Sequence, residues 1–124
     1  GVQDTISCVQ GDGLSTIQHQ GLFNVICSNP PYIPDAEMGQ LAPNVKQWEP
    51  TLALSGGQNG LQVIGPMIET APELLHSGGM LLLELAASTK SQVLELAYSN
   101  NDYRDATILR DRFGDDRFLR VMKR

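Results

Sequence analysis

The stretch MLLLEL, residues 80–85, constrains the fold more than any other part of the chain. A short run with apolar residues at successive positions is typical of a strand that is buried on both faces. It follows residues 61–75, where apolar side chains recur every three or four positions and predict an amphipathic helix. We expect Pro66 and Pro72 to kink or shorten this helix, and Gly78-Gly79 to end it.

Two β-branched runs precede the helix, at residues 5–10 and 22–28, and both predict buried strands. The first run ends in Gly-Asp-Gly and the second in Asn-Pro-Pro, which are sequences that stop a strand. Residues 32–59 have no sustained periodicity and contain three prolines. We therefore expect a long ordered loop there, with one helical turn near residues 38–41, and loops of this length are usually functional or mobile.

The last third of the chain predicts one more helix and two more strands. Ser88 is expected to cap a helix that runs to about Asn100, with an inward face formed by Val93, Leu96 and Ala97. Residues 105–112 and 117–122 predict strands, and the intervening Phe-Gly-Asp-Asp predicts a hairpin turn between them.

This order of elements predicts an α/β fold, in which one domain, residues 1–124, has a sheet covered by helices on both faces. In such sheets, ligands bind beyond the carboxyl ends of the strands. Asp12, Asn29 and Glu84 all fall at predicted strand ends. These three polar side chains are therefore candidates for a common site.

Composition argues against several classes of protein. No apolar run approaches the length that crosses a bilayer. Cys8 and Cys27 each lie in an apolar run, so we expect packed thiols in a reducing compartment, the cytoplasm or the mitochondrial matrix, and neither a disulfide nor a metal site. His19 and His76 lie in polar surroundings and are expected to be solvated.

Charge argues against a large nonspecific contact with nucleic acid, because such contacts use many Lys and Arg and this chain has a net charge of −5. Seven of the nine basic residues lie in residues 104–124, where they alternate with apolar and acidic residues. This pattern favours the solvated face of a hairpin over a binding patch.

The stretch CSNPPYIPD, residues 27–35, leaves the second predicted strand with almost no backbone donors, because proline has no N–H. Asn29 adds a side-chain carbonyl, so the segment presents acceptors without competing donors. Two fixed acceptors can orient a planar NH2 group, such as a carboxamide or an exocyclic base amine, and Tyr32 can cover its flat face. The alternative is a rigid Asn-Pro-Pro turn with no further role.

The nitrogen of such a group is a weak nucleophile, because its lone pair is delocalised. Acceptors placed for a nitrogen that is becoming tetrahedral would favour the attacking geometry over the resting one. A general base is not required, because the nitrogen becomes acidic as it gains its new bond.

These residues resemble a known family. Asn29-Pro30-Pro31-Tyr32 after a hydrophobic strand resembles the NPPY motif of amino-methylating, S-adenosyl-L-methionine-dependent methyltransferases. Trp48-Glu49-Pro50, the stretch GGQNGL at residues 56–61 and the ending RDRFGDDRFLRV resemble the HemK-type release-factor glutamine N5-methyltransferases. The similarity extends over essentially the whole chain and implies a Rossmann-like class I methyltransferase sheet with a carboxyl-terminal antiparallel hairpin.

The resemblance implies that Asn29 and the Pro30 carbonyl bind the amide of a glutamine in the Gly-Gly-Gln loop of a translation release factor. Tyr32 would pack beside that amide as a third catalytic residue, and Pro31, Glu49 and Pro50 would complete the substrate side. Glu49 and Pro50 can equally form a structural corner.

The resemblance also implies that Asp12, together with Asn29, borders the S-adenosyl-L-methionine pocket, with Asp12 at its adenine end; the alternative for Asp12 is a turn residue. Gly56-Gly57 and Gly60 favour a tight turn before the helix over a phosphate-binding loop, because no Walker-type lysine follows. Glu84 is either a site carboxylate or a charge at a strand end.

Some parts of the family pattern are not found in this sequence. Enzymes of this type have a glycine-rich first strand and helix, a second strand whose acidic residue holds the cofactor ribose, and an amino-terminal helical domain. The chain is therefore expected to be the carboxyl-terminal part of the catalytic domain, without the first two strands and inactive alone. We expect residues 5–10 to pair with the NPPY strand or to leave the sheet, and the exposed edge to promote self-association.

Two alternatives remain beside the glutamine methyltransferase. The first is part of an adenine-N6 methyltransferase acting on nucleic acid, since the NPPY motif is shared with those enzymes. The second is a non-catalytic binding module that acts through the release factor or the sheet edge.

Overall fold

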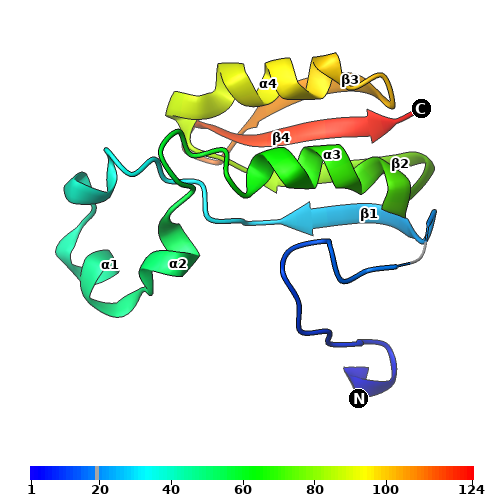
Figure 1. The fold of residues 1–124 in the computed structure, drawn as a ribbon, viewed down its shortest axis with the longest axis horizontal. Helices are drawn as coiled ribbons and strands as arrows, with labels where there is room; N and C mark the ends of the chain where they lie inside the picture. Colours follow the sequence, from blue (N-terminus) through cyan, green and yellow to red (C-terminus); the bar gives the residue numbers. More distant parts are fainter. Residues whose placement is uncertain (19) are drawn as a thin grey trace.

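A computed structural model describes residues 1–18 and 20–124; His19 lies outside the described residues. Within these ranges, four strands form one mixed sheet: β1 (Phe23–Ser28), β2 (Leu75–Glu84), β3 (Tyr103–Arg110) and β4 (Asp116–Lys123). The strand order is β1-β2-β4-β3, with β1 parallel to β2 and the other two pairs antiparallel (Figure 1). The predicted strand before the NPPY motif and the carboxyl-terminal hairpin are confirmed.

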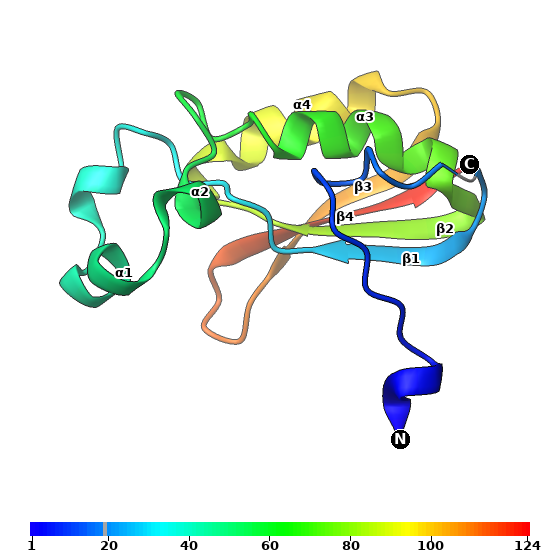
Figure 2. The same ribbon diagram turned by 60° about the horizontal axis from the view of Figure 1, so that its bottom comes forward.

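Both longer helices, α3 (Ile64–Leu74) and α4 (Lys90–Ser99), lie on the same face of the sheet (Figure 2). Their buried side chains, among them Ile64, Ile68 and Val93, pack against Leu81 and Leu83 of β2. The expectation that helices cover both faces is therefore wrong for the described residues. MLLLEL alternates between buried and half-buried positions because only one of its faces meets helices.

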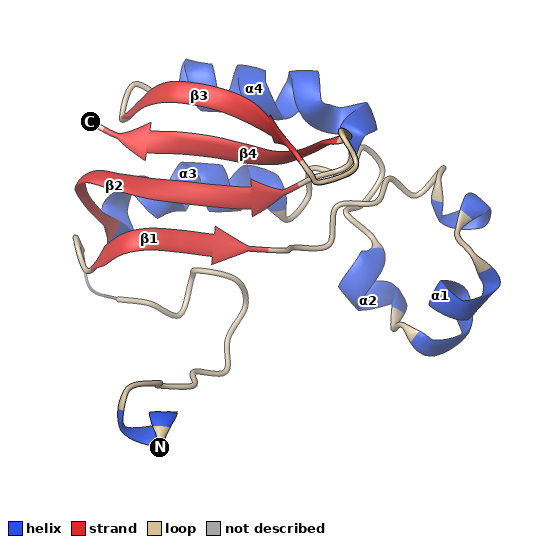
Figure 3. Cartoon of the chain, turned by 180° about the vertical axis from the view of Figure 1, so that it is seen from behind, coloured by secondary structure: helices blue, strands red, loops and turns tan. Residues whose placement is uncertain are grey.

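The segment at residues 5–10 is not a strand, which makes that prediction wrong. All six residues are exposed, and the amino-terminal segment runs past β1 without joining the sheet (Figure 3). Its β-branched residues have strand propensity, but a strand forms only where a partner supplies hydrogen bonds and packing. The expectation that this run leaves the sheet is confirmed, whereas Leu14 and Ile17 just after it pack against the core.

β1 is an edge strand, since it pairs with β2 alone. Val25 in its middle is 47% exposed, so the prediction of a fully buried strand is wrong here. Cys27 on β1 and Cys8 in the amino-terminal segment are both free and exposed, and the expectation of packed thiols is also wrong. An apolar neighbourhood in the sequence does not bury a side chain when no second element covers it.

The predicted loop at residues 32–59 contains more structure than expected. The turn near 38–41 is confirmed as the 3-10 helix η2 (Met38–Gln40), and two short helices follow, α1 (Pro43–Trp48) and α2 (Thr51–Leu54). They form a lobe beyond the carboxyl end of β1 (Figure 3). Further 3-10 turns are η1 (Val2–Asp4) and η3 (Ala87–Thr89), and among the described residues no helix is long and apolar enough to span a membrane.

Several element boundaries differ from the prediction. Helix α3 begins at Ile64 and ends at Leu74, four residues before Gly78-Gly79, which instead lie in a bulge of β2 where the register with β1 shifts. Pro66 falls in the first turn, where the missing N–H removes no helical hydrogen bond. Ser88 does not cap α4, because η3 places Thr89 at the N-cap, and the Thr89 hydroxyl donates to the Ala86 carbonyl. His76 is exposed, but in β2 and not at a helix end.

The proline inside α3 has a compensating contact from β3. Pro72 has no N–H for the carbonyl of Ile68, four residues earlier. The Tyr103 hydroxyl donates to that carbonyl at 2.8 Å, in a buried position. Burial raises the pKa of Tyr103 well above its usual value, so the hydroxyl stays a donor. This contact ties the helix to the hairpin.

We therefore expect Tyr103→Phe to lower the free energy of unfolding by about 1–3 kcal/mol, because a buried carbonyl loses the donor that replaces the missing Pro72 N–H. Urea unfolding followed by circular dichroism measures the change. Tyr98→Phe is the matched control: Tyr98 is 68% exposed and its hydroxyl donates to the Ala106 carbonyl, which water can replace. Equal losses of stability in the two variants would contradict the role of the Tyr103 hydroxyl as the donor that replaces the Pro72 N–H. The same role would be contradicted if Tyr103→Phe cost as much stability in a Pro72→Ala background as in the wild-type chain.

Candidate functional site

The candidate site begins where β1 ends. Ser28 is the last residue of the strand, and Asn29-Pro30-Pro31 carry the chain out of the sheet beside the carboxyl end of β2. Pro30 is buried and Asn29 is exposed. Since neither proline has an N–H, this turn cannot be held by backbone donation at those two positions, and its position depends on the residues that flank it.

The residues after Tyr32 are pinned to a glycine-rich segment by three backbone hydrogen bonds. The Ile33 N–H donates to the Leu54 carbonyl at 3.0 Å, and the Gly56 N–H donates back to the Ile33 carbonyl at 2.9 Å. The Asp35 N–H then donates to the Gly57 carbonyl at 3.0 Å. A short parallel bridge between Ile33 and Ser55 results, and it fixes the exit of the NPPY turn.

Gly56-Gly57 and Gly60 form a tight turn, as the sequence favours. Gly57 and Gly60 have φ values of 80° and 75°, which side-chain-bearing residues rarely adopt. A Cβ atom on Gly60 would lie 2.6 Å from the Tyr32 carbonyl oxygen. Glycine is needed here because the turn packs directly on the backbone of the NPPY motif.

Tyr32 is tethered to the next strand by its side chain. Its hydroxyl donates to Oε1 of Glu84, the last residue of β2, at 2.7 Å. Burial and the Glu84 carboxylate raise the pKa of Tyr32 to about 12, although Arg117 nearby lowers it in part. Glu84 therefore lies in the site region as the acceptor for Tyr32.

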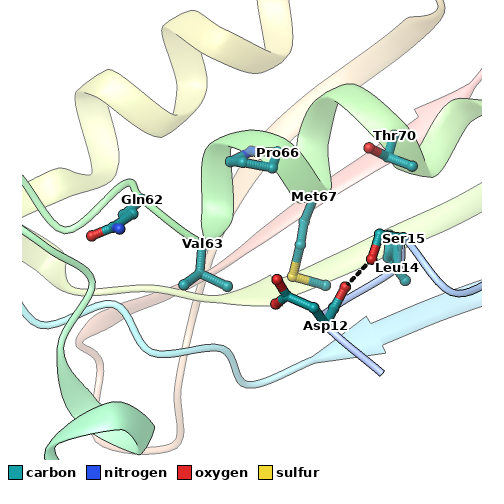
Figure 4. A pocket seen from close by; sticks show the side chains of 9 residues that line it. Asp12, Leu14, Ser15, Gln62, Val63, Pro66, Met67 and Thr70 are labelled. Atoms are coloured by element: carbon teal, nitrogen blue, oxygen red, sulfur yellow. Dashed lines mark hydrogen bonds between the residues drawn. The ribbon is translucent and has the colours of Figure 1, made fainter. Parts of the chain in front are cut away.

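A cavity of about 460 Å³ lies on one side of the NPPY turn. Its wall contains Asn29, Pro30 and Pro31 together with Asp12, and its apolar lining comes from Leu14, Ile26, Leu52, Val63 and Met67. A smaller cavity of about 190 Å³ shares Asp12, Leu14, Val63 and Met67 with it. Figure 4 shows Met67 of α3 pointing toward Asp12, with Val63 beside it. The Ser15 hydroxyl donates to the Asp12 carbonyl at 2.6 Å and stabilises this turn.

A second cavity of about 330 Å³ adjoins the same turn. Asn29 and Pro30 line it again, with Tyr32, Ile33 and Glu49, and the lobe contributes Val45, Ala53 and Leu54. Asn29 and Pro30 thus line both cavities, one with Asp12 and one with Glu49. Both cavities have the size of a small-ligand or side-chain site.

Most, but not all, of the predicted site residues line one or both of these cavities. Asn29 and Pro30 line both cavities, Asp12 and Pro31 line only the larger one, and Tyr32 and Glu49 line only the other. Pro50 lines neither and serves as the N-cap residue of α2. Among the described residues, no group of His, Cys, Asp and Glu is arranged to hold a metal ion.

Sequence reasoning missed the apolar lining and the partner of Tyr32. Leu52 and Met67 border the larger cavity, but Leu52 lies in the predicted loop and Met67 has only the spacing of an ordinary helix position. The Glu84 contact joins residues 52 positions apart, so no local pattern reveals it. Arg117 was visible only as one of several basic residues in the hairpin.

The fold is that of known methyltransferases. A structure titled as the E. cuniculi Mtq2-Trm112 complex, responsible for methylation of the termination factor eRF1, matches 94% of this chain and 60% of its own with a TM-score of 0.61 at 23% identity. A protein-(glutamine-N5) methyltransferase from Alicyclobacillus acidocaldarius matches 82% of this chain and 49% of its own, with a TM-score of 0.51 at 25% identity.

The sequence is similar to a narrower group. Release factor glutamine methyltransferases from Thermosynechococcus vestitus and Synechocystis are 44% and 38% identical to this chain over 94% of its length. The one from Rhodopirellula baltica is 31% identical over 98%. The chain spans about 40% of the length of these relatives. No protein-family model matches it. The chain is thus homologous to part of the release factor glutamine methyltransferases, which confirms the resemblance of its motifs.

Substituting Gly60 should disturb the NPPY turn. We expect Gly60→Ala to destabilise the chain by about 1–3 kcal/mol from backbone strain, and further because of the overlap with the Tyr32 carbonyl. Gly114→Ala is the matched control, since Gly114 also has a positive φ, of 91°, but open space around its Cβ position. Urea unfolding measures both variants, and a Gly60→Ala loss no larger than that of Gly114→Ala would contradict the close approach.

Proposed function

We propose that this chain carries the substrate-facing part of an S-adenosyl-L-methionine-dependent methyltransferase that modifies the side-chain amide of a glutamine in the Gly-Gly-Gln loop of a translation release factor. The observation that carries the proposal is that Asn29 and Pro30 line both cavities. A methyl donor bound in one cavity and an acceptor amide bound in the other would both lie next to these two residues. The sequence similarity to release factor glutamine methyltransferases favours glutamine as the acceptor.

The larger cavity fits the cofactor in its chemistry. Leu14, Leu52, Val63 and Met67 give it apolar walls for a flat heterocycle, and Asp12 supplies a carboxylate that can accept from an amino group or a hydroxyl. S-adenosyl-L-methionine supplies an electrophilic methyl group when bound. Asn29 and the end of β1 would border the reacting end of the pocket.

The residues of the second cavity would orient the amide. The Asn29 side-chain oxygen and the Pro30 carbonyl are acceptors for the two hydrogens of an NH2 group, and they leave the nitrogen lone pair free to point toward the larger cavity. These acceptors stabilise the amide as its nitrogen becomes tetrahedral and more acidic. The ring of Tyr32 and the side chain of Glu49 line the cavity in which the rest of the glutamine would lie.

A protein substrate is favoured over a nucleic acid for this chain. Two arginines of the hairpin are paired with its own acidic residues: Arg117 with Asp111 at 3.5 Å and Arg110 with Asp116 at 3.3 Å. Lys90 of α4 pairs with the same Asp116 at 2.5 Å. These pairs reduce the positive charge that the hairpin can offer to phosphates, and the net charge of −5 adds to this argument.

Binding of a release factor should depend on the side-chain amide of Asn29 and on that of the glutamine in the Gly-Gly-Gln loop. We expect Asn29→Ala to weaken binding of a bacterial release factor about tenfold, the loss that one hydrogen bond to the substrate amide implies. Replacing the glutamine of the Gly-Gly-Gln loop by alanine should cost the wild-type chain a similar factor and cost Asn29→Ala nothing more. Isothermal titration measures these affinities, and Asn101→Ala, in an exposed turn, is the control.

Two results would contradict the assigned substrate. One is glutamine-independent binding, which would favour a non-catalytic module. The other is binding of DNA or RNA that Asn29→Ala weakens while release factor binding stays unchanged, which would favour the adenine-N6 alternative.

Cofactor affinity tests how much of the pocket these residues supply. Asp12 is the only carboxylate among the described residues that line the two cavities on the cofactor side. With a single carboxylate to engage both the adenine and the ribose, we expect this chain to bind S-adenosyl-L-methionine more weakly than micromolar and to be inactive in methyl transfer alone. Titration with the cofactor measures this, with Asp12→Asn as the comparison, and micromolar binding would contradict it.

A further inference from the structure

The NPPY turn has few ways to be held in place. Pro30 and Pro31 donate no backbone hydrogen bond, and Asn29 is exposed at the mouth of both cavities. The next side chain along the chain is Tyr32, which is half-buried and whose ring lines the cavity on the Glu49 side. The orientation of this ring therefore helps to set the shape of the cavity beside the two acceptors, the Asn29 side-chain oxygen and the Pro30 carbonyl.

Glu84 is in a position to set that orientation. It is the last residue of β2 and lies half-buried on the face of the sheet opposite the helices, because its neighbours Leu83 and Leu85 face the buried side. A half-buried carboxylate requires a donor. The hydroxyl of Tyr32 is that donor, at 2.7 Å from Oε1.

Arg117 supplies a positive charge next to this contact. Its backbone carbonyl accepts from the Leu85 N–H at 3.0 Å, which fixes the start of β4 beside the end of β2. Its guanidinium lies 3.5 Å from the Asp111 carboxylate and 3.9 Å from that of Asp115, so the hairpin turn holds it in place. Arg117 lowers the pKa of Tyr32, whereas Glu84 and burial raise it.

We propose that Glu84 is a positioning residue, which acts through the Tyr32 hydroxyl to fix the aromatic wall beside the amide-binding acceptors, with Arg117 of the carboxyl-terminal hairpin as an opposing charge near that hydroxyl. This inference rests on the proposed function, because the role of Asn29 and Pro30 as amide-binding acceptors is part of that function. The contacts that carry it are the side-chain hydrogen bond from Tyr32 to Glu84 at the end of β2, and the backbone hydrogen bond that places Arg117 of β4 beside that end. It gives the hairpin turn a role at the site, since Asp111 and Asp115 hold Arg117 in place.

The contact is tested first without any ligand. The chain has three tyrosines, so the Cζ signals of ¹³C-labelled tyrosine can be assigned by loss of one signal in Tyr32→Phe. From a pKa of about 12, we expect Glu84→Gln to shift the titration of Tyr32 toward the ordinary value of about 10 and Arg117→Gln to shift it upward. Glu95→Gln, on the exposed side of α4, should leave it unchanged. Measurements stop below the pH at which circular dichroism reports unfolding.

Shifts of opposite sign distinguish the proposal from general damage to the fold, which would move Tyr32 in one direction in both variants. Unchanged titration in Glu84→Gln would overturn the contact. Shifts of the same sign in Glu84→Gln and Arg117→Gln would overturn the role of Arg117 as an opposing charge.

A double-mutant cycle then tests whether Glu84 acts through Tyr32. The readout is the side-chain NH2 resonance of Asn29 and the affinity for a release factor. We expect Glu84→Gln and Tyr32→Phe each to shift the resonance and to weaken binding about threefold to tenfold, the cost of a misoriented contact. In the Tyr32→Phe background, Glu84→Gln should add no further shift or loss.

An additional loss in that background would overturn the route through Tyr32 and indicate a separate role for Glu84. The two readouts keep this inference distinct from the proposed function. If the wild-type chain binds no release factor, the proposed function fails, while the Asn29 resonance still decides whether Glu84 positions the turn.

Discussion

The Asn-Pro-Pro turn that leaves β1 lacks backbone N–H donors at its two prolines, and contacts from the surrounding structure fix its position instead. Two consecutive prolines remove the backbone donors that would otherwise fix the chain. The hydrogen bonds of Ile33 with the segment at residues 54–56, the close packing of Gly60 and the side-chain tether from Tyr32 to Glu84 act on either side of the prolines. The acceptors of Asn29 and Pro30 are presented by a segment that is rigid because its neighbours are ordered.

Elements that depend on local pattern were predicted from the sequence. The apolar period of α3 and α4, the strands β1 and β2, the hairpin and the tight glycine turn all agree with the structure to within a few residues. The resemblance of the motifs to release factor glutamine methyltransferases was also evident from the residues. Boundaries differ for two reasons: the local 3-10 turn η3 makes Thr89 the cap in place of Ser88, and α3 ends before the glycines, where Leu75 pairs with Phe23 of β1.

Predictions that depended on what covers a segment were wrong. Residues 5–10 have strand propensity but no partner, and Cys27 lies on an edge strand with no helix above it. Burial is a property of pairs of elements, and a sequence window contains only one of them. For the same reason the contact between Tyr32 and Glu84 and the apolar lining from Leu52 and Met67 were found only in three dimensions.

The strand order has a consequence for how the chain is made. β4 is the last element in the sequence, yet it lies in the interior of the sheet between β2 and β3. During synthesis from the amino terminus, β2 and β3 emerge before the strand that joins them, so each has an unpaired edge until residues 116–123 are available. The four-stranded sheet can therefore form only after residues 116–123 have been synthesised, and its formation depends on contacts between segments far apart in the chain.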